Sequence, residues 1–178
     1  MKRRFLICFL IFFSLILRGW EGRCDDRVLA AVLYCFDGDT CRVKTNAGLW
    51  FNARLFGIDA QETERKGRKK SPGQPFAEPA KKALNQKIKG KAVKLKQADL
   101  DHYNRPIVEV WLKDRNINLQ MVEEGWAEAY RGKTKRISLK PYLEAEKRAK
   151  KKKLGIWKLK NYVSPREFRK KGKSSSSQ

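Results

Sequence analysis

The chain has 178 residues, with 42 Lys and Arg against 19 Asp and Glu, which gives a formal net charge of +23. Its length suits one globular domain with tails, and a hydrophobic content of 41% excludes a chain that is disordered throughout. So positive a charge predicts attraction to polyanions such as nucleic acid or an anionic lipid surface. A pocket for an acidic small molecule does not require so large a positive charge.

The N-terminus has the pattern of a secretory signal. A basic stretch over residues 2–4 precedes an apolar run over residues 5–17. This run is shorter than the roughly 20 residues that cross a bilayer as a helix. We therefore expect residues 1–22 to be a signal peptide that exports the chain to the periplasm or the medium. A retained membrane anchor is the alternative.

Cys24, Cys35 and Cys41 follow this segment, and Cys8 lies within it. Oxidising conditions outside the cell allow one disulfide with a thiol left over, or a bond between molecules. Cys35 and Cys41 are interpreted equally well as small buried hydrophobic residues on strands. One His and no Cys-x-x-Cys argue against a structural zinc site.

Three short strands are predicted at the start of the domain. Apolar residues over 28–35, the turn Asp37-Gly38-Asp39-Thr40 and the alternating run over 41–44 predict a hairpin. A second turn leads to a third strand over 49–58. The segment over 63–74 is rich in Lys, Arg, Gly, Ser and Pro, and we expect a mobile basic loop there.

The remaining predicted elements are three helices and two strands. Apolar residues at three- and four-residue spacing that end at a glycine indicate helices, and alternation indicates strands. The helices are expected over 76–88, 118–124 and 141–153, and the strands over 92–97 and 107–112. The tail over 164–178 is basic and rich in Ser and Lys, and we expect it to be disordered.

Five short strands with a helix after the third have the order of a five-stranded Greek-key β-barrel, the OB-fold. We therefore expect an α+β domain over residues 28–163, with a barrel and three α-helices. OB-fold surfaces commonly bind oligonucleotides. A sheet with helices on one face is the alternative architecture.

A small group of acids stands out in a chain so rich in lysine. Asp39 lies in the first hairpin turn, and Asp59 and Glu62 come just after the third strand. If that strand pairs with the hairpin, the three carboxylates converge. Two of them with a backbone carbonyl would suit Ca²⁺ or Mg²⁺, and the third could act as a base toward water. Solvated acids near a common Asp-Gly turn are the alternative interpretation.

Arg54 and Arg105 are candidates for binding a phosphate. Cleavage of a phosphodiester places negative charge on the phosphoryl oxygens, and a guanidinium fork matches their geometry. In so basic a chain most arginines are solvated surface charges. The position of Arg54 between Ala53 and Leu55 favours a specific role, whereas nothing local distinguishes Arg105.

Four segments, in order, resemble the successive motifs of the staphylococcal nuclease family. They are Asp37-Gly38-Asp39-Thr40, Arg54-Leu55-Phe56-Gly57-Ile58-Asp59-Ala60-Gln61-Glu62, Asp101-His102-Tyr103-Asn104-Arg105 and Leu154-Gly155-Ile156-Trp157. Each is weak alone, but four in register make the resemblance specific. It implies an OB-fold barrel with three helices and a secreted monomer without a stable protein partner. It also implies Ca²⁺-dependent hydrolysis of DNA and RNA that leaves 3′-phosphate ends.

The resemblance further implies the roles of single residues. Asp39 and Asp59 would hold Ca²⁺ through their carboxylates, and Ala60 through its carbonyl. Glu62 would be the general base or would position the attacking water.

For the phosphate, the resemblance implies that Arg54 and Arg105 bind it and stabilise the transition state. Tyr103 and Tyr130 would contact the substrate. Departures from the family's pattern are Gln61 in place of Pro, which suggests a less rigid loop, and His102 and Asn104 in place of Lys or Arg and of Gly.

Two other functions fit the composition. A non-catalytic OB-fold protein that binds nucleic acid needs only the fold and the charge, although the five residues implied in the chemistry are all present. A cationic membrane-active protein is suggested by the apolar N-terminus and the basic tail. No amphipathic basic helix with an aromatic face supports it.

Overall fold

The computed structural model describes residues 26–64, 72–134 and 136–174. The expected signal peptide, Cys24 and most of the expected basic loop lie outside the described residues. Within the described part of the chain, no helix is long and apolar enough to cross a membrane.

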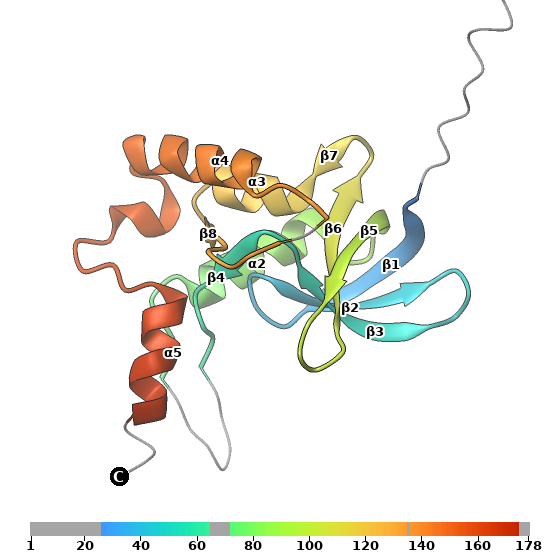
Figure 1. Ribbon diagram of the computed structural model, residues 1–178, viewed down its shortest axis with the longest axis horizontal. Coiled ribbons are helices and arrows are strands. Elements are labelled where there is room, and N and C mark those ends of the chain that lie inside the picture. Colours follow the sequence, from blue (N-terminus) through green and yellow to red (C-terminus); the bar gives the residue numbers. More distant parts are fainter. Residues whose placement is uncertain (1–25, 65–71, 135, 175–178) are drawn as a thin grey trace, which may run out of the picture.

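Strands predominate in the first part of the described chain and helices in the last part (Figure 1). The strands are β1 Val28–Cys35, β2 Thr40–Thr45, β3 Trp50–Leu55, β4 Ile58–Ala60, β5 Ala92–Leu100, β6 Pro106–Leu112, β7 Arg115–Asn116 and β8 Ala127–Ala129. The helices are α2 Ala77–Ile88, α3 Ile117–Glu123, α4 Lys140–Lys151, the 3₁₀ helix η1 Gly155–Lys158 and α5 Pro165–Ser174.

Five of the strands close into a barrel. Hydrogen-bonded neighbours follow the order β3-β2-β1-β5-β6, and β6 pairs in parallel with β3 through Arg54 with Ile107 and Leu55 with Val108. Strands β4 and β8 form a separate antiparallel pair. This closed barrel confirms the predicted OB-fold and excludes the open sheet considered as its alternative.

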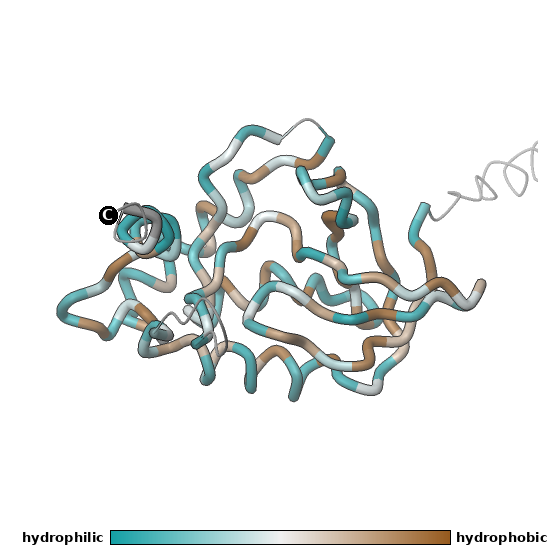
Figure 2. The backbone as a smooth tube through the Cα atoms, turned by 90° about the horizontal axis from the view of Figure 1, so that it is seen from below, coloured by the Kyte–Doolittle hydropathy of each residue, from teal (hydrophilic) through white to brown (hydrophobic). Residues whose placement is uncertain are grey.

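Alternate residues of the strands fill the barrel, because successive side chains of a strand point to opposite faces. Val43, Ala53 and Leu55 are buried in this way. Figure 2 shows hydrophobic and hydrophilic stretches interspersed along the backbone. Helix α4 adds Tyr142, whose ring centroid lies 5.7 Å from that of Phe56. The barrel and its helices therefore share one core.

The strand expected over 49–58 is in fact two strands. Strand β3 ends at Leu55 and β4 begins at Ile58, because Gly57 turns the backbone with a φ of 77°. A Cβ atom at Gly57 would lie 2.9 Å from the Tyr142 ring, so the close packing also requires glycine. The turn carries Asp59 away from the barrel wall and onto β4.

The tail expected to be disordered contains helix α5, so that prediction is wrong for residues 165–174. The Glu167 N–H donates to Ser164 Oγ at 3.2 Å, and the Ser164 N–H donates to the Glu167 carboxylate at 3.3 Å. This reciprocal pair is a capping box, and Pro165 occupies the favoured first helical position. The local capping contacts favour a helix here, although the basic composition of the segment had suggested disorder.

Candidate active site

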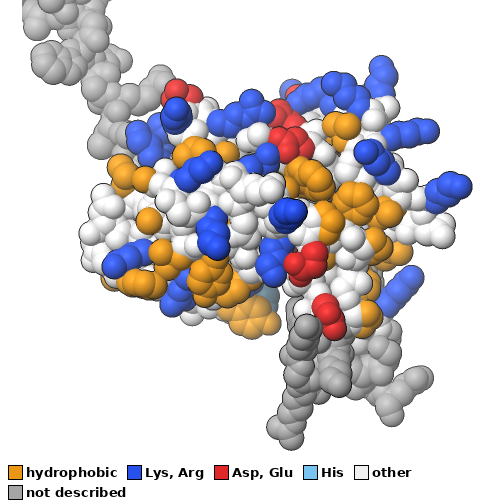
Figure 3. Space-filling model, turned by 180° about the vertical axis from the view of Figure 1, so that it is seen from behind, with side chains coloured by type: hydrophobic (Ala, Val, Ile, Leu, Met, Phe, Trp, Pro, Cys, Tyr) orange, Lys and Arg blue, Asp and Glu red, His pale blue; other side chains and the backbone are white. Residues whose placement is uncertain are grey.

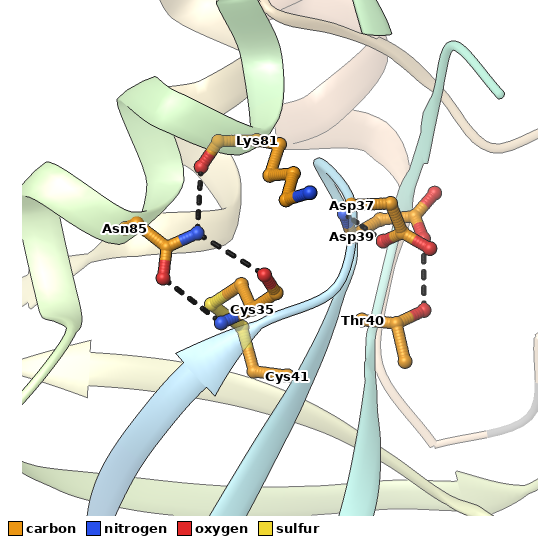
Figure 4. Close-up of a disulfide and its surroundings, with 7 residues drawn as sticks. All are labelled: Cys35, Asp37, Asp39, Thr40, Cys41, Lys81 and Asn85. Atoms are coloured by element: carbon orange, nitrogen blue, oxygen red, sulfur yellow. Dashed lines mark hydrogen bonds between the residues drawn. A yellow bond between two sulfur atoms is a disulfide. The ribbon is translucent and has the colours of Figure 1, made fainter. Parts of the chain in front are cut away.

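Asp39 lies in the turn between β1 and β2, and a disulfide closes that turn. Cys35 and Cys41 face each other across the hairpin and are bonded (Figure 4). Among the interpretations that the sequence left open, a disulfide within the chain is therefore correct for this pair. Asn85 of α2 accepts a hydrogen bond from the Cys35 N–H at 2.9 Å and donates to the Cys35 carbonyl at 3.1 Å.

Gly38 allows the Asp39 turn to pack tightly against its neighbours. A Cβ atom at Gly38 would lie 2.6 Å from the Ala60 Cβ and 2.9 Å from the Ala80 Cβ. Because the turn approaches β4 so closely, Asp39 Oδ2 accepts a hydrogen bond from the Ala60 N–H at 2.8 Å. The hairpin turn and β4 thus form one unit.

Arg54 of β3 joins two buried carboxylates. Its Nη1 donates to Asp39 Oδ1, and its Nη2 donates to Asp59 Oδ1 at 3.0 Å. Burial tends to lower the pKa of Arg54, but the charges of Asp39 and Asp59 more than offset it, so this pKa is raised and the side chain stays a cation. Burial raises the pKa of Asp39 well above its usual value in spite of Arg54. The Asp39 carboxylate therefore carries a cost for burial that its ion pair with Arg54 offsets only in part.

Glu62 follows β4 and is held through its backbone by Gln74. The Glu62 N–H donates to Gln74 Oε1 at 3.0 Å, and the Glu62 carbonyl accepts from the Gln74 N–H at 2.9 Å. The buried Gln61 accepts a hydrogen bond from the Phe76 N–H at 2.7 Å, next to the start of α2. A hydrogen bond thus restrains the position where the family usually has a proline ring.

Arg169 of α5 is a member of this cluster that the sequence did not single out. Its Nη1 donates to Asp59 Oδ1 at 3.0 Å and to Glu62 Oε1 at 2.7 Å, and its Nη2 donates to Asp59 Oδ2 at 2.7 Å. The hydrogen bonds to Asp59, followed by those to Glu62, raise the pKa of Arg169. The structure therefore brings Asp39, Asp59 and Glu62 together through two guanidinium groups.

The sequence contains only an indirect signal for Arg169. The Ser-x-x-Glu capping box with Pro165 could have predicted the helix. It could not have shown which basic residue of that helix reaches the carboxylates, because that depends on how α5 packs against β4.

Arg105 lies in the turn between β5 and β6, two residues before Ile107, which pairs with Arg54. Its Nε donates to Asp101 Oδ2 at 2.7 Å, and its backbone N–H donates to Asp101 Oδ1 at 2.9 Å. Its guanidinium carbon lies 5.5 Å from the centroid of the Tyr103 ring. In the described part of the chain, Arg105 contacts Asp101 and Tyr103. It makes no described contact with Asp39, Asp59 or Glu62.

Asn104 and Tyr103 lie in the same turn between β5 and β6, and Tyr130 lies beside the turn between β3 and β4. Asn104 has a φ of 56°, a region that Asn tolerates better than most residues, so it can replace the family's usual glycine. Tyr103 is 70% exposed and Tyr130 is 42% exposed. The Tyr130 N–H donates to the carbonyl of Gly57 at 2.9 Å, which places this tyrosine beside the turn that leads to Asp59.

The expected metal ligands are oxygen atoms, which is the ligand type that a hard cation prefers. Asp39 and Asp59 are 2% and 4% exposed and provide carboxylate oxygens that already bind a cationic group. Among the described residues, no group of three or more His, Cys, Asp or Glu side chains is arranged to hold a metal ion. A cation here would need further oxygen ligands, which the Ala60 carbonyl and water could supply, with a phosphate oxygen in place of a water when substrate binds.

One face of the molecule is shown in Figure 3. Lys and Arg side chains are distributed over that face and outnumber the acidic ones. A cluster of buried carboxylates and arginines, on an OB-fold with a basic surface, is suited to binding a phosphate ester.

Comparisons with known proteins agree with the fold. The profile of the family described as "Staphylococcal nuclease homologue" matches residues 52–159. A Haemophilus influenzae protein named "Uncharacterized endonuclease" is 34% identical over 138 residues, which are 77% of this chain and 70% of that protein. The chain therefore belongs to the staphylococcal nuclease family.

Fungal proteins show the same similarity over a smaller share of their length. Two proteins named "Probable endonuclease LCL3", from Komagataella phaffii and Vanderwaltozyma polyspora, are 34% and 37% identical over 125 residues. The matches cover 66% of this chain and 54% and 44% of those proteins, so the chain spans about half of their length.

Proposed function

We propose that this protein is a Ca²⁺-dependent nuclease that hydrolyses phosphodiester bonds of DNA and RNA and leaves 3′-phosphate ends. The observation that supports it best is the guanidinium of Arg54 between the buried carboxylates of Asp39 and Asp59. Arg169 links Asp59 in turn to Glu62. Membership of the staphylococcal nuclease family, with relatives named as endonucleases, supports the same class of reaction.

In this proposal Asp39, Asp59 and the carbonyl of Ala60 hold the cation. The bound ion supplies positive charge that offsets the charge developing on the phosphoryl oxygens. Arg54 donates hydrogen bonds to the same phosphate, and its raised pKa keeps it cationic at any working pH. Removing a preorganised charge partner of this kind typically costs on the order of 10²–10³ in rate.

Glu62 is the general base in this proposal. A carboxylate oxygen of Glu62 accepts a proton from the water that attacks phosphorus, and Gln74 holds the backbone of Glu62 in place. Arg105, oriented by Asp101, stabilises the phosphoryl oxygens and the departing 5′-oxygen.

The substrate is expected to bind without regard to its base sequence. The excess of Lys and Arg contacts phosphates, which carry no sequence information. The exposed rings of Tyr103 and Tyr130 are available for contacts with the substrate. We propose that the enzyme acts as a monomer without a stable protein partner.

We also propose that the protein is exported. The basic and apolar pattern of residues 1–22 supports a signal, and the disulfide between Cys35 and Cys41 is consistent with an oxidising compartment. A retained membrane anchor would leave the same domain outside the cytoplasm.

The metal dependence of hydrolysis tests the function. The protein and its Glu62→Gln variant are incubated with single-stranded DNA, duplex DNA and RNA, in Ca²⁺, in Mg²⁺ and in a chelator. We expect cleavage by the unaltered protein only with Ca²⁺, with a rate at least about 10²-fold lower in the variant. Chemical analysis of the ends should find 3′-phosphate.

Salt-sensitive binding without cleavage in either metal would contradict the enzyme. It would show that the protein is a non-catalytic nucleic-acid-binding module. Binding to anionic vesicles, but not to nucleic acid, would instead indicate the membrane-active alternative.

A further inference from the structure

The guanidinium of Arg169 spans the two carboxylates on which the proposed chemistry depends. One nitrogen, Nη1, contacts both Asp59 and Glu62, and the other contacts the second oxygen of Asp59. Asp59 Oδ1 also accepts a hydrogen bond from Arg54. Both oxygens of Asp59 are thus engaged by arginine N–H groups.

Helix α5 is fixed beside the site by the residue that also holds Glu62. The side-chain amide of Gln74 donates to the carbonyl of Val163 at 2.9 Å, directly before the capping box of α5. Pro165, the first residue of the helix, is buried. Figure 1 shows α5 below β4, apart from the barrel. The N-terminal end of α5 is therefore held in place, and Arg169, one turn further along the helix, reaches the carboxylates.

A divalent cation and Arg169 need the same oxygens. A hard cation binds carboxylate oxygens directly, at distances of about 2.3–2.6 Å for Ca²⁺. Asp59 Oδ1 accepts two N–H groups and Oδ2 accepts a third, so these lone pairs are directed at guanidinium nitrogens. Like charges in one site repel each other. Arg169 and the ion therefore compete for the oxygens of Asp59.

We propose that α5 is an autoinhibitory segment whose Arg169 substitutes for the divalent cation at Asp59 and Glu62. Binding of the cation displaces Arg169, and α5 with it, from the site. Arg169 also binds Oε1 of Glu62, one of the two carboxylate oxygens that would accept a proton from water. This proposal rests on the proposed function for the identity of the ion.

The expected size of the effect follows from how often α5 is docked. The apparent affinity of a ligand falls by the fraction of molecules that are competent to bind it. If α5 is docked in about nine of ten molecules, removal of the Arg169 guanidinium should strengthen Ca²⁺ binding about tenfold.

Isothermal titration calorimetry of the full chain with Ca²⁺ alone tests the competition. The variants are Arg169→Ala and, as a matched control with the same loss of charge, Lys170→Ala, whose side chain is exposed on the same helix. We expect Arg169→Ala to bind Ca²⁺ about tenfold more tightly than Lys170→Ala. Equal affinities in the two variants would overturn the proposal and leave the proposed function intact.

Hydrogen exchange of the unaltered protein provides a second test that needs no variant. Saturating Ca²⁺ should accelerate amide exchange in residues 165–172, because displaced α5 loses the contacts that hold it. Unchanged exchange with Ca²⁺ bound would overturn the displacement. If no variant binds Ca²⁺ in calorimetry, both the competition and the ion of the proposed function are wrong.

Discussion

Asp101 holds both the backbone and the guanidinium of Arg105 with one carboxylate. Partial burial tends to raise the pKa of Asp101, but hydrogen bonds from the Arg105 and Tyr103 N–H groups more than offset it, so this pKa is lowered from 3.8. A lowered pKa in the folded state means that the carboxylate stabilises the protein above the unfolded value. That stability is lost as the pH falls through the folded value.

The variant Asp101→Asn should therefore show a pH-dependent loss of stability. Above about pH 5 we expect its free energy of unfolding to be lower than that of the unaltered protein by at most about 1 kcal/mol, because the ion pair is partly exposed. The difference should vanish as the pH falls below 3.8, the ordinary value for this group. Urea unfolding at a series of pH values measures it. A difference that stays constant down to pH 2 would contradict this account.

Single residues also show what sequence patterns could and could not indicate about the site. The sequence led us to expect that Asp39, Asp59 and Glu62 converge, because strand pairing brings the hairpin turn to the end of the third strand. It did not indicate Arg169, which lies 107 residues after Glu62. No local pattern encodes a contact between a basic tail and a distant carboxylate.

At the scale of elements, Asn118 connects α3 to the barrel. It is fully buried, donates to the carbonyls of Phe56 and Val108 at 2.9 Å, and accepts from the Val110 N–H at 2.9 Å. A buried backbone group that loses its partner costs about 1–3 kcal/mol. One amide therefore satisfies backbone groups of β6 and of the turn after β3.

We expect Asn118→Ala to lower the free energy of unfolding by about 2–5 kcal/mol, because the Val110 N–H and the Phe56 carbonyl lose a partner. Glu123→Ala, on the same helix, removes surface ion pairs with Arg115 and Arg148 and should cost less than about 1 kcal/mol. Guanidinium unfolding curves compare the two variants. Equal losses would show that the Asn118 contacts are not what anchors α3.

Elements with strong alternation or spacing were predicted well from the sequence, and weakly patterned elements were not. The barrel strands and α2, α3 and α4 lie within a few residues of their expected ranges. Strands β4 and β8 are three residues each, too short to show alternation. Helix α5 is rich in Lys and Arg, so its start is marked in the sequence mainly by the capping box and Pro165.

At the scale of the whole molecule, the net charge of +23 favours electrostatic attraction to nucleic acid. Cations on the protein release counterions from nucleic acid, so the affinity falls steeply with salt. The loss between 50 and 200 mM salt is about tenfold for two neutralised phosphates of duplex DNA and about a thousandfold for six.

We therefore expect the Glu62→Gln variant to bind duplex DNA with an affinity that falls at least about tenfold over this salt range. Oligonucleotides of equal length and different sequence should bind equally, because phosphate contacts carry no base information. Fluorescence anisotropy at several salt concentrations measures both. An affinity that is flat in salt, or strongly dependent on sequence, would show that base contacts dominate.

Because Cys35 and Cys41 are bonded, the structure of the loop that carries Asp39 depends on whether a sample is oxidised or reduced. The two residues are register partners at the mouth of the turn, six positions apart in the chain. With the bond intact, Asp39 belongs to a small covalent ring. After reduction it belongs to an open turn held by Asn85 and by its own hydrogen bonds. A sample purified in a thiol reagent and one purified without it therefore contain two different forms of this loop.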